Sequence, residues 1–263
     1  MVNFIEKYFD VTPDPRSADW FLIGSLKQTC LIVACYAFFV KKLGPSLMKN
    51  RKPFELRTII RIYNISQICI NGYLVFKASP YILGRSIWTG RCFSVDESNP
   101  ETERYTLWLS YTYCLVKILD LLDTVFFVLR KRYNQVSFLH FYHHLLLALL
   151  APVVYHYNPN GHMGVMGYIN SIVHTVMYFY YFLSNLSPNM KNSIWWKKYI
   201  TLMQMGQFVF LTGFFLYPLI NGEFCGYPFK FLYFALAQNF VFMILFSNFY
   251  IKTYVTKAKL KPN

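Results

Sequence analysis

The stretch FLHFYHHLLLALLAPVVYHY, residues 138–157, indicates the fold class because it joins a histidine cluster to a long apolar run. It has about the 20 residues that an α-helix needs to cross a bilayer. His140, His143 and His144 lie within its first two turns. Because polar side chains inside a bilayer are costly and need partners, three imidazoles in this place indicate a functional site.

The composition extends this interpretation to the whole chain of 263 residues. Hydrophobic residues make up 55% of it and charged residues 14%, against roughly 25% charged residues in soluble domains. The net charge is +14, but Lys and Arg fall in short gaps between apolar stretches, which argues against a nucleic-acid partner. We predict an all-α integral membrane protein with a single domain over residues 1–263.

Seven stretches are long and apolar enough to be predicted membrane spans. The second is the weakest, because Asn64, Gln67 and Asn71 interrupt it; their helical spacing predicts that they face the bundle interior together. Lys27 in the first span is either a snorkelling side chain or the sign of a later helix start. The predicted spans are residues 21–40, 59–79, 106–129, 138–157, 163–183, 197–220 and 229–251.

The loops between these spans alternate between basic and non-basic. Residues 41–58 contain six basic side chains and one acidic side chain, whereas residues 155–162 contain no Lys or Arg. Since cytosolic loops carry the excess of Lys and Arg, this alternation predicts a short lumenal N-terminus and a basic cytosolic C-terminal tail.

Two further features agree with this topology. The last five residues, KLKPN, contain Lys259 and Lys261 and match the dilysine retrieval signal of endoplasmic reticulum membrane proteins; the alternative is a solvated basic tail. Cys92 and Cys225 fall in predicted lumenal loops, where oxidising conditions favour a disulfide between them; the alternative is two free thiols. Cys114 lies inside a span and is predicted to be a core residue.

Polar residues of four spans are predicted to share one depth. At 1.5 Å per residue, Asp123 and His143 lie roughly 9 Å from the cytosolic ends of their spans. Gln204 lies at roughly 10 Å and His174 at roughly 15 Å. A shared layer predicts one site. A narrower alternative is a Lys117–Asp120 pair that only holds helices together. Within each of three spans, polar residues recur at helical spacing and are predicted to form a stripe that faces the bundle interior. These inward stripes are Lys117, Asp120 and Thr124 with Asp123 at the edge; Asn170, His174, Tyr178 and Tyr181; and Thr201, Gln204 and Gln207.

Four motifs occur in order along the chain: KILDLLDT (117–124), QVSFLHFYHH (135–144), NSIVHTVMYFYY (170–181) and TLMQMGQ (201–207). With these motifs the chain closely resembles the ELOVL family, the elongases of very long chain fatty acids. The resemblance implies seven helices, with spans two to seven forming a barrel around a narrow acyl tunnel. It also implies the condensing step of fatty acid elongation, in which acyl-CoA and malonyl-CoA give 3-ketoacyl-CoA, carbon dioxide and CoA. The resemblance further implies association with the reductases and dehydratase of the elongation cycle; a homodimer remains open.

Our hypothesis for the chemistry is that His143 and His174 bracket the thioester and that one of them, preferably His143, forms an acyl-imidazole. No metal or cofactor is required if hydrogen-bond donors stabilise the enolate oxygen. His140, His144, Asn170 and Gln204 are candidates for that role or for fixing tautomers. Asp120 and Asp123 are predicted to orient histidines, and the motif match implies that Lys117 binds or activates the thioester.

CoA carries phosphates, so its binding site is predicted to be basic. Arg130 and Lys197 continue the inward stripes at the predicted cytosolic face, although topology alone also places positive charge there. Tyr178, Tyr180 and Tyr181 are candidates for the pantetheine path, or are interfacial anchors.

Two other classes use similar features. A membrane di-iron desaturase or hydroxylase also uses an HxxHH box but needs about eight histidines, and this chain has six. A seven-helix receptor or transporter would not need a histidine cluster near the cytosolic face. Preferred acyl chain length and unsaturation are not encoded in any motif that we recognise.

Overall fold

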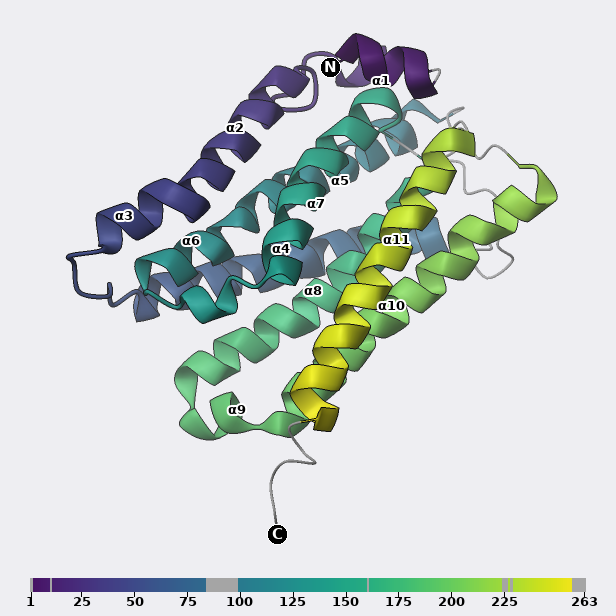
Figure 1. Ribbon diagram of the computed structural model, residues 1–263. Coiled ribbons are helices and arrows are strands. Elements are labelled where there is room, and N and C mark those ends of the chain that lie inside the picture. Colours follow the sequence, from purple (N-terminus) through teal and green to yellow (C-terminus); the bar gives the residue numbers. More distant parts are fainter. Residues whose placement is uncertain are drawn as a thin grey trace. The chain divides into compact units, whose positions relative to one another are not determined.

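The computed structural model describes residues 2–9, 11–83, 99–159, 161–223, 227 and 229–256. Every regular element in these ranges is a helix, as the all-α prediction requires (Figure 1). Four residues with predicted roles lie outside the described residues, so the disulfide and the retrieval signal remain predictions. These residues are Cys92, Cys225, Lys259 and Lys261.

Among the described residues, four helical stretches are long and apolar enough to cross a membrane: Leu26–Met48, Phe138–Tyr157, Ile194–Asn221 and Phe229–Thr256. The remaining predicted spans, near residues 59–79, 106–129 and 163–183, are also helical. They contain the polar residues on which the site prediction depends, and such residues reduce the hydropathy of a helix. The count of seven spans therefore remains a prediction.

The chain divides into two compact units, which are described separately. Unit 1 comprises Met1–Ile62 and Ser94–Gly164, and unit 2 comprises Tyr63–Phe93 and Val165–Asn263. The helices of unit 1 are α1 (Val2–Phe9), η1 (Pro15–Ser17), α2 (Leu26–Phe38), the π-helix η2 (Phe39–Leu43), α3 (Gly44–Met48), α5 (Pro100–Leu119), α6 (Leu121–Leu129), η4 (Tyr133–Gln135) and α7 (Phe138–Tyr157).

The core of unit 1 forms where α2 and α6 pack with the first half of α7. Val33 and Tyr36 come from α2, Leu121 and Val128 from α6, and Ala148 from α7; all are buried. Helix α7 also packs against α5. The helix that carries the three neighbouring histidines thus packs against three other helices, α2, α5 and α6.

The predicted first span, residues 21–40, is wrong at its start, because helix α2 begins only at Leu26. Leu22 adopts a left-handed backbone with φ 70°. At Gly24, a Cβ atom would lie 1.9 Å from the carbonyl oxygen of Ala18, so only glycine fits this turn. Lys27 therefore marks a later helix start, and the helical stretch continues through η2 and α3 to Met48.

The predicted third span, residues 106–129, is wrong as a single helix. Helix α5 begins earlier, at Pro100, because the Asn99 side chain accepts hydrogen bonds from the N–H groups of Glu101 (3.0 Å) and Thr102 (3.2 Å). It ends at Leu119, and α6 starts after a turn at Asp120. The fourth span matches its prediction at both ends.

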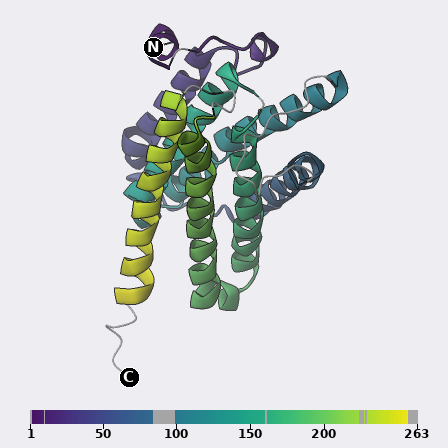
Figure 2. The ribbon, with the colours of Figure 1, turned by 90° about the vertical axis from the view of Figure 1, so that its right-hand side faces the viewer.

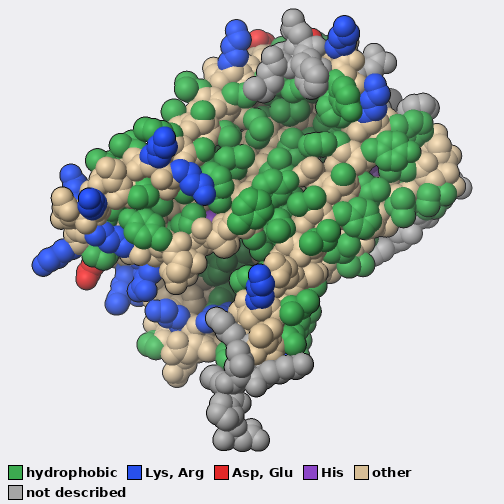
Figure 3. Space-filling model, in the orientation of Figure 1, with side chains coloured by type: hydrophobic (Ala, Val, Ile, Leu, Met, Phe, Trp, Pro, Cys, Tyr) green, Lys and Arg blue, Asp and Glu red, His purple; other side chains and the backbone are tan. Residues whose placement is uncertain are grey.

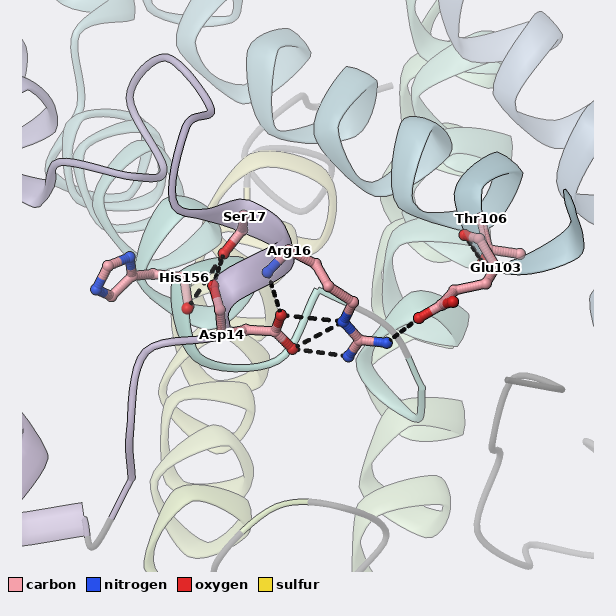
Figure 4. A network of polar contacts seen from close by, with 6 residues as sticks. All are labelled: Asp14, Arg16, Ser17, Glu103, Thr106 and His156. Atoms are coloured by element: carbon pink, nitrogen blue, oxygen red, sulfur yellow. Dashed lines mark hydrogen bonds and ion pairs between the residues drawn. The ribbon is translucent and has the colours of Figure 1, made fainter. Parts of the chain in front are cut away.

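The N-terminal segment is tied to the ends of α5 and α7 by the polar network in Figure 4. The Asp14 carboxylate accepts hydrogen bonds from Nη2 of Arg16 at 2.7 Å and from the Arg16 N–H at 2.8 Å. Arg16 also binds Glu103 at the start of α5. The N–H of Asp14 and the hydroxyl of Ser17 donate to the carbonyl oxygen of His156 near the end of α7. This network therefore joins three segments of unit 1.

Unit 2 contains most of α4 (Arg57–Leu83) and of α8 (Met163–Leu186), together with α9 (Pro188–Asn192), α10 (Ile194–Asn221), α11 (Phe229–Tyr250) and the π-helix η5 (Ile251–Thr256). Helices α10 and α11 run antiparallel side by side (Figures 1 and 2). The Asn239 side chain joins them by donating to the Phe208 carbonyl and to the Thr212 hydroxyl, both at 2.8 Å. Gly222, with φ 70°, ends α10 in a left-handed cap. Apart from a few residues at their ends, helices α4, α8, α10 and α11 cover the residue ranges predicted as spans for this unit.

Candidate active site

The three histidines of residues 140–144 form a contiguous group at the start of α7. The ring centroids of His140 and His144 are 4.2 Å apart, and those of His143 and His144 are 5.4 Å apart. The Ser137 side chain caps this end of the helix by accepting a hydrogen bond from the His140 N–H at 3.2 Å. The cap fixes the first turn, which carries His140, and the helical spacing then aligns His144 with it.

A hydroxyl group on α6 orients His140. Oγ1 of Thr124 lies 2.9 Å from Nε2 of His140, and the Tyr36 hydroxyl on α2 donates to the same Oγ1 at 2.7 Å. Sequence reasoning placed Thr124 on an inward stripe but gave the orienting role to Asp120 and Asp123, which no contact described for His140 supports. It missed Tyr36; the available signal was a tyrosine within an apolar stretch at helical spacing from Val33 and Val40.

A buried ion pair lies at the junction of α5 and α6. Nζ of Lys117 is 2.8 Å from Oδ2 of Asp120, and both side chains are at most 5% exposed. The same Nζ lies 4.9 Å from the centre of the Tyr113 ring. The partners are three residues apart, so this contact by itself does not hold two distant helices together. Thr124 is also buried and Asp123 is partly exposed, as the predicted stripe requires.

Cys114 is fully buried beside this junction, which confirms that it is a core residue. A nucleophilic cysteine must be reachable by its substrate and ionise readily. The histidines nearby are partly exposed, so in unit 1 they are the more accessible nucleophiles.

Basic side chains gather where α3, the start of α4 and the end of α6 meet (Figure 3). Burial, and then the positive charges of Arg132 and Arg57, lower the pKa of the Arg130 guanidinium. Nζ of Lys131 donates to the carbonyl oxygen of Lys49 at 3.3 Å. A bound anion would stabilise cations that repel one another in this way, so Arg130 suits the phosphate-binding role predicted for it.

In unit 2, His174 is buried on α8 within a row of aromatic rings. Its ring centroid is 5.7 Å from that of Tyr178, which is 5.9 Å from that of Tyr181. Asn170, one turn before His174, is also buried. Tyr181 departs from the predicted inward stripe, because it is 39% exposed. The buried part of the stripe is therefore Asn170, His174 and Tyr178.

The polar residues of α4 extend this row. Asn64, Gln67 and Asn71 are all buried, which confirms that they share an inward face. Nε2 of Gln67 donates to the Tyr63 hydroxyl at 3.0 Å, and that hydroxyl lies 3.2 Å from the hydroxyl of Tyr178. A hydrogen-bonded chain thus runs from α4 to the aromatic neighbour of His174.

The other predicted residues of unit 2 have varied surroundings. Gln204 is partly buried, and its Nε2 donates to Sδ of Met177 at 3.5 Å. Tyr180 is buried, stacks on Trp196 and donates to the Met190 carbonyl. Lys197 is exposed near the start of α10, where an anion could reach it. His174 and the histidines of α7 belong to different units, so the predicted pairing of His143 with His174 remains a prediction.

The chemistry available in these groups is that of imidazoles, an ion pair, amides and phenols. Within the described part of the chain, no three His, Cys, Asp or Glu side chains lie together in a way that could hold a metal ion. Neutral imidazole is a competent nucleophile and general base, and amide and hydroxyl groups can donate to a developing oxyanion.

The apolar helices and the histidines within them define a multi-pass membrane protein of the histidine-box type. The family model "ELO: GNS1/SUR4 family" matches residues 21–262. The chain therefore belongs to this family, which confirms the resemblance inferred from the four motifs.

Individual relatives agree over almost the full length. Very long chain fatty acid elongase 7 of Drosophila melanogaster is 39% identical over 261 residues, which cover 97% of this chain and 78% of that protein. Very long chain fatty acid elongase 7 of Rattus norvegicus is 36% identical over 259 residues, covering 95% and 88%. Very long chain fatty acid elongase 1 of Mus musculus is 36% identical over 255 residues, again covering 95% and 88%.

Proposed function

We propose that this protein is the condensing enzyme of fatty acid elongation, a 3-ketoacyl-CoA synthase that acts on long-chain acyl-CoA and malonyl-CoA. The observation that carries the proposal is the contiguous histidine group of α7, together with a buried Lys–Asp pair in the same unit, in a chain that belongs to the elongase family. Acyl transfer needs a nucleophile and oxyanion stabilisation, and these residue types can supply both.

In the first stage, an imidazole nitrogen of His143 attacks the thioester carbonyl of acyl-CoA. The carbon–sulfur bond breaks, the acyl group stays on the imidazole, and CoA leaves as a thiol with the proton that the imidazole loses. In the second stage, malonyl-CoA loses carbon dioxide, and the electron pair of the broken bond becomes an enolate. The enolate carbon attacks the acyl carbon, the carbon–nitrogen bond breaks, and the imidazole regains a proton from solvent.

The other groups have supporting roles in this proposal. His174 brackets the thioester opposite His143, and Asn170, Gln204, His140 and His144 donate to oxyanions or fix tautomers. Lys117, with its partner Asp120, stabilises negative charge that develops near the thioester. Arg130 and Lys197 bind CoA phosphates at the cytosolic face.

The family and the sequence also support an arrangement in the membrane. We propose seven spans in the endoplasmic reticulum membrane, with the N-terminus lumenal and the C-terminus cytosolic, and with spans two to seven around an acyl tunnel. The alternation of basic and non-basic loops supports this orientation. The reductases and dehydratase of the elongation cycle are the proposed partners.

The direct test is a condensation assay with purified protein, a long-chain acyl-CoA and carboxyl-labelled malonyl-CoA. We expect labelled carbon dioxide and 3-ketoacyl-CoA in equal amounts, with neither product when acyl-CoA is omitted. Iron analysis of the same preparation tests the desaturase alternative. Stoichiometric iron with no release of carbon dioxide would contradict the condensing role.

A further inference from the structure

We propose that Tyr36, on the first apolar helix, is a positioning residue that fixes the tautomer of His140 through the Thr124 hydroxyl. The effect on catalysis rests on the proposed function, but the tautomer is a property of the protein alone. The three residues come from α2, α6 and α7, all within unit 1.

The hydrogen bonds determine where the protons lie. A hydroxyl group has one proton to donate and can accept other hydrogen bonds. The Tyr36 hydroxyl donates to Oγ1 of Thr124 at 2.7 Å, so Thr124 must direct its own proton elsewhere. The only other hydrogen-bond partner of this hydroxyl among the described residues is Nε2 of His140, at 2.9 Å. Nε2 therefore accepts, and neutral His140 carries its proton on Nδ1.

The surroundings of Tyr36 hold it in this position. Its ring stacks on that of Phe141 with the centroids 5.9 Å apart and an angle of 11° between the planes. Nζ of Lys41 lies 4.3 Å from the centre of the Phe141 ring. Tyr36 is 6% exposed and Thr124 is fully buried. Phe141, which directly follows His140, thus couples the histidine group to α2 a second time.

The surface groove beside Tyr36 is apolar, although the charge of the Asp123 carboxylate also acts on its hydroxyl. A groove of about 390 Å³ borders the residue. Apart from Tyr36, its lining comes from α2, η2, α5 and α6: Ile32, Cys35, Phe39, Ile118, Leu119, Leu121, Leu122 and Val125. In a bilayer, lipid chains rather than water face such a groove, and hydrogen bonds in these surroundings exchange little with solvent.

A fixed tautomer matters because the two nitrogens of a neutral imidazole have opposite roles. With Nε2 occupied by Thr124, Nδ1–H of His140 is a donor. The ring of His140 is 4.2 Å from that of His144, which contacts His143. The hydrogen bonds from Tyr36 through Thr124 thus determine which nitrogen of His140 donates and which accepts, next to the proposed nucleophile His143.

Nitrogen NMR of protein labelled with ¹⁵N-histidine tests the tautomer directly. The signals of His140 are identified by their loss in His140→Gln. In the unmodified protein we expect a protonated Nδ1 and an unprotonated Nε2. Thr124→Val should abolish this preference, Tyr36→Phe should weaken it, and Thr124→Ser should retain it. A proton on Nε2 in the unmodified protein, or an unchanged pattern in Thr124→Val, would overturn the proposal.

Thr112→Val and Tyr155→Phe are the matched controls within unit 1. The Thr112 hydroxyl donates only to the Trp108 carbonyl of its own helix, and Tyr155 is a buried tyrosine that packs on Tyr113. Neither control should change the His140 signals. Thermal melting of each variant in detergent identifies any that fail to fold, in which case Thr124→Ser and Tyr36→Phe, the mildest changes, decide.

Condensation kinetics form the second arm of the test. Removing the hydrogen-bond partner of a metal-ligating histidine typically costs about 10- to 100-fold in activity, and we take the same range for His140. We expect Thr124→Val to lower kcat by about that factor with little change in KM, and Thr124→Ser to restore most of it. An altered tautomer with normal kcat would overturn the positioning role. If the unmodified protein does not catalyse condensation, the proposed function fails while the NMR result still decides the tautomer.

Discussion

The polar groups of the two units differ in kind. In unit 1 they are ionic or titratable, with the Lys117–Asp120 pair close in sequence to a hydroxyl that binds His140. In unit 2 they are mostly amides and phenols, and His174 is buried among them. Both sets lie within stretches predicted to span the membrane, so membrane insertion alone does not explain the difference.

This difference leads us to propose that the polar groups of the two units have different roles in the reaction. Groups that change charge in the reaction belong where ion pairs and hydroxyls can compensate them, as in unit 1. Neutral amides and phenols orient polar substrate groups without adding charge to the membrane interior. In this account, unit 1 carries most of the groups that change charge, and unit 2 carries one imidazole among neutral amides and phenols.

The largest expected effect comes from removing one imidazole from each unit. His143→Ala and His174→Ala should each lower condensation by about 1,000-fold or more, because removal of a nucleophile or its partner costs that much in acyl-transfer enzymes. Steady-state assays of purified variants measure the loss. His156→Gln, at the other end of α7, is the control and should retain activity. Near-normal turnover in either alanine variant would refute the paired role.

The next effect concerns the charges that distinguish unit 1. Asp120→Asn leaves the buried Lys117 ammonium without its anionic partner and should destabilise the protein by about 3–5 kcal/mol. The double variant Lys117→Met, Asp120→Leu removes both charges and should recover much of that stability while staying inactive. Denaturant unfolding in mixed micelles compares the two variants. Equal losses in both would show that the pair is not compensating charge.

In unit 2 the corresponding change is smaller, because no charge is left unpaired. Gln67→Leu removes the donor to the Tyr63 hydroxyl and should cost about 1–3 kcal/mol. Cys69→Ala, at an exposed position of the same helix, is the control and should have little effect. If Gln67→Leu destabilises the protein as much as Asp120→Asn does, the proposed contrast between the two units is wrong.

The smallest effect is a pH dependence outside the spans. Burial alone would raise the pKa of Asp14, but hydrogen bonds from the side chain and N–H of Arg16, together with its charge, lower the pKa below 3.8. A carboxyl group whose pKa falls on folding stabilises the protein above its unfolded pKa and loses this contribution as the pH falls through the folded value. Asp14→Asn should therefore lower stability at pH 7 by at most about 1 kcal/mol, and the difference should shrink as the pH falls through the folded pKa of Asp14. Melting temperatures of both proteins, measured from pH 7 downward, test this.

The sequence predicted helix positions where local signals agree. Residues 138–157 match α7 at both ends, because Ser137 caps an apolar run of one membrane thickness. The start at Leu26 was missed, because it depends on a backbone approach between Gly24 and Ala18. The turn at Asp120 was also missed, since the motif that contains it reads as a continuous helix.

The sequence predicted which side chains of the site are buried, but it did not predict which residues from other helices contact them. The spacing of Lys117, Asp120 and Thr124 correctly predicted that all three are buried, although α5 ends and α6 begins between them. The contact of Tyr36 with Thr124 joins residues 88 positions apart. No periodicity within a single helix reports such a contact, so the hydroxyl partner of His140 was not predicted, while an orienting role of Asp120 and Asp123 toward the histidines stays a prediction.

The most direct test of the central claim is mass spectrometry of the purified protein after incubation with a long-chain acyl-CoA and no malonyl-CoA. The account predicts one acyl group per chain on His143, lost on addition of malonyl-CoA and absent in His143→Ala. A protein that turns over both substrates but carries no acyl group, or carries it on Cys114, would contradict the account.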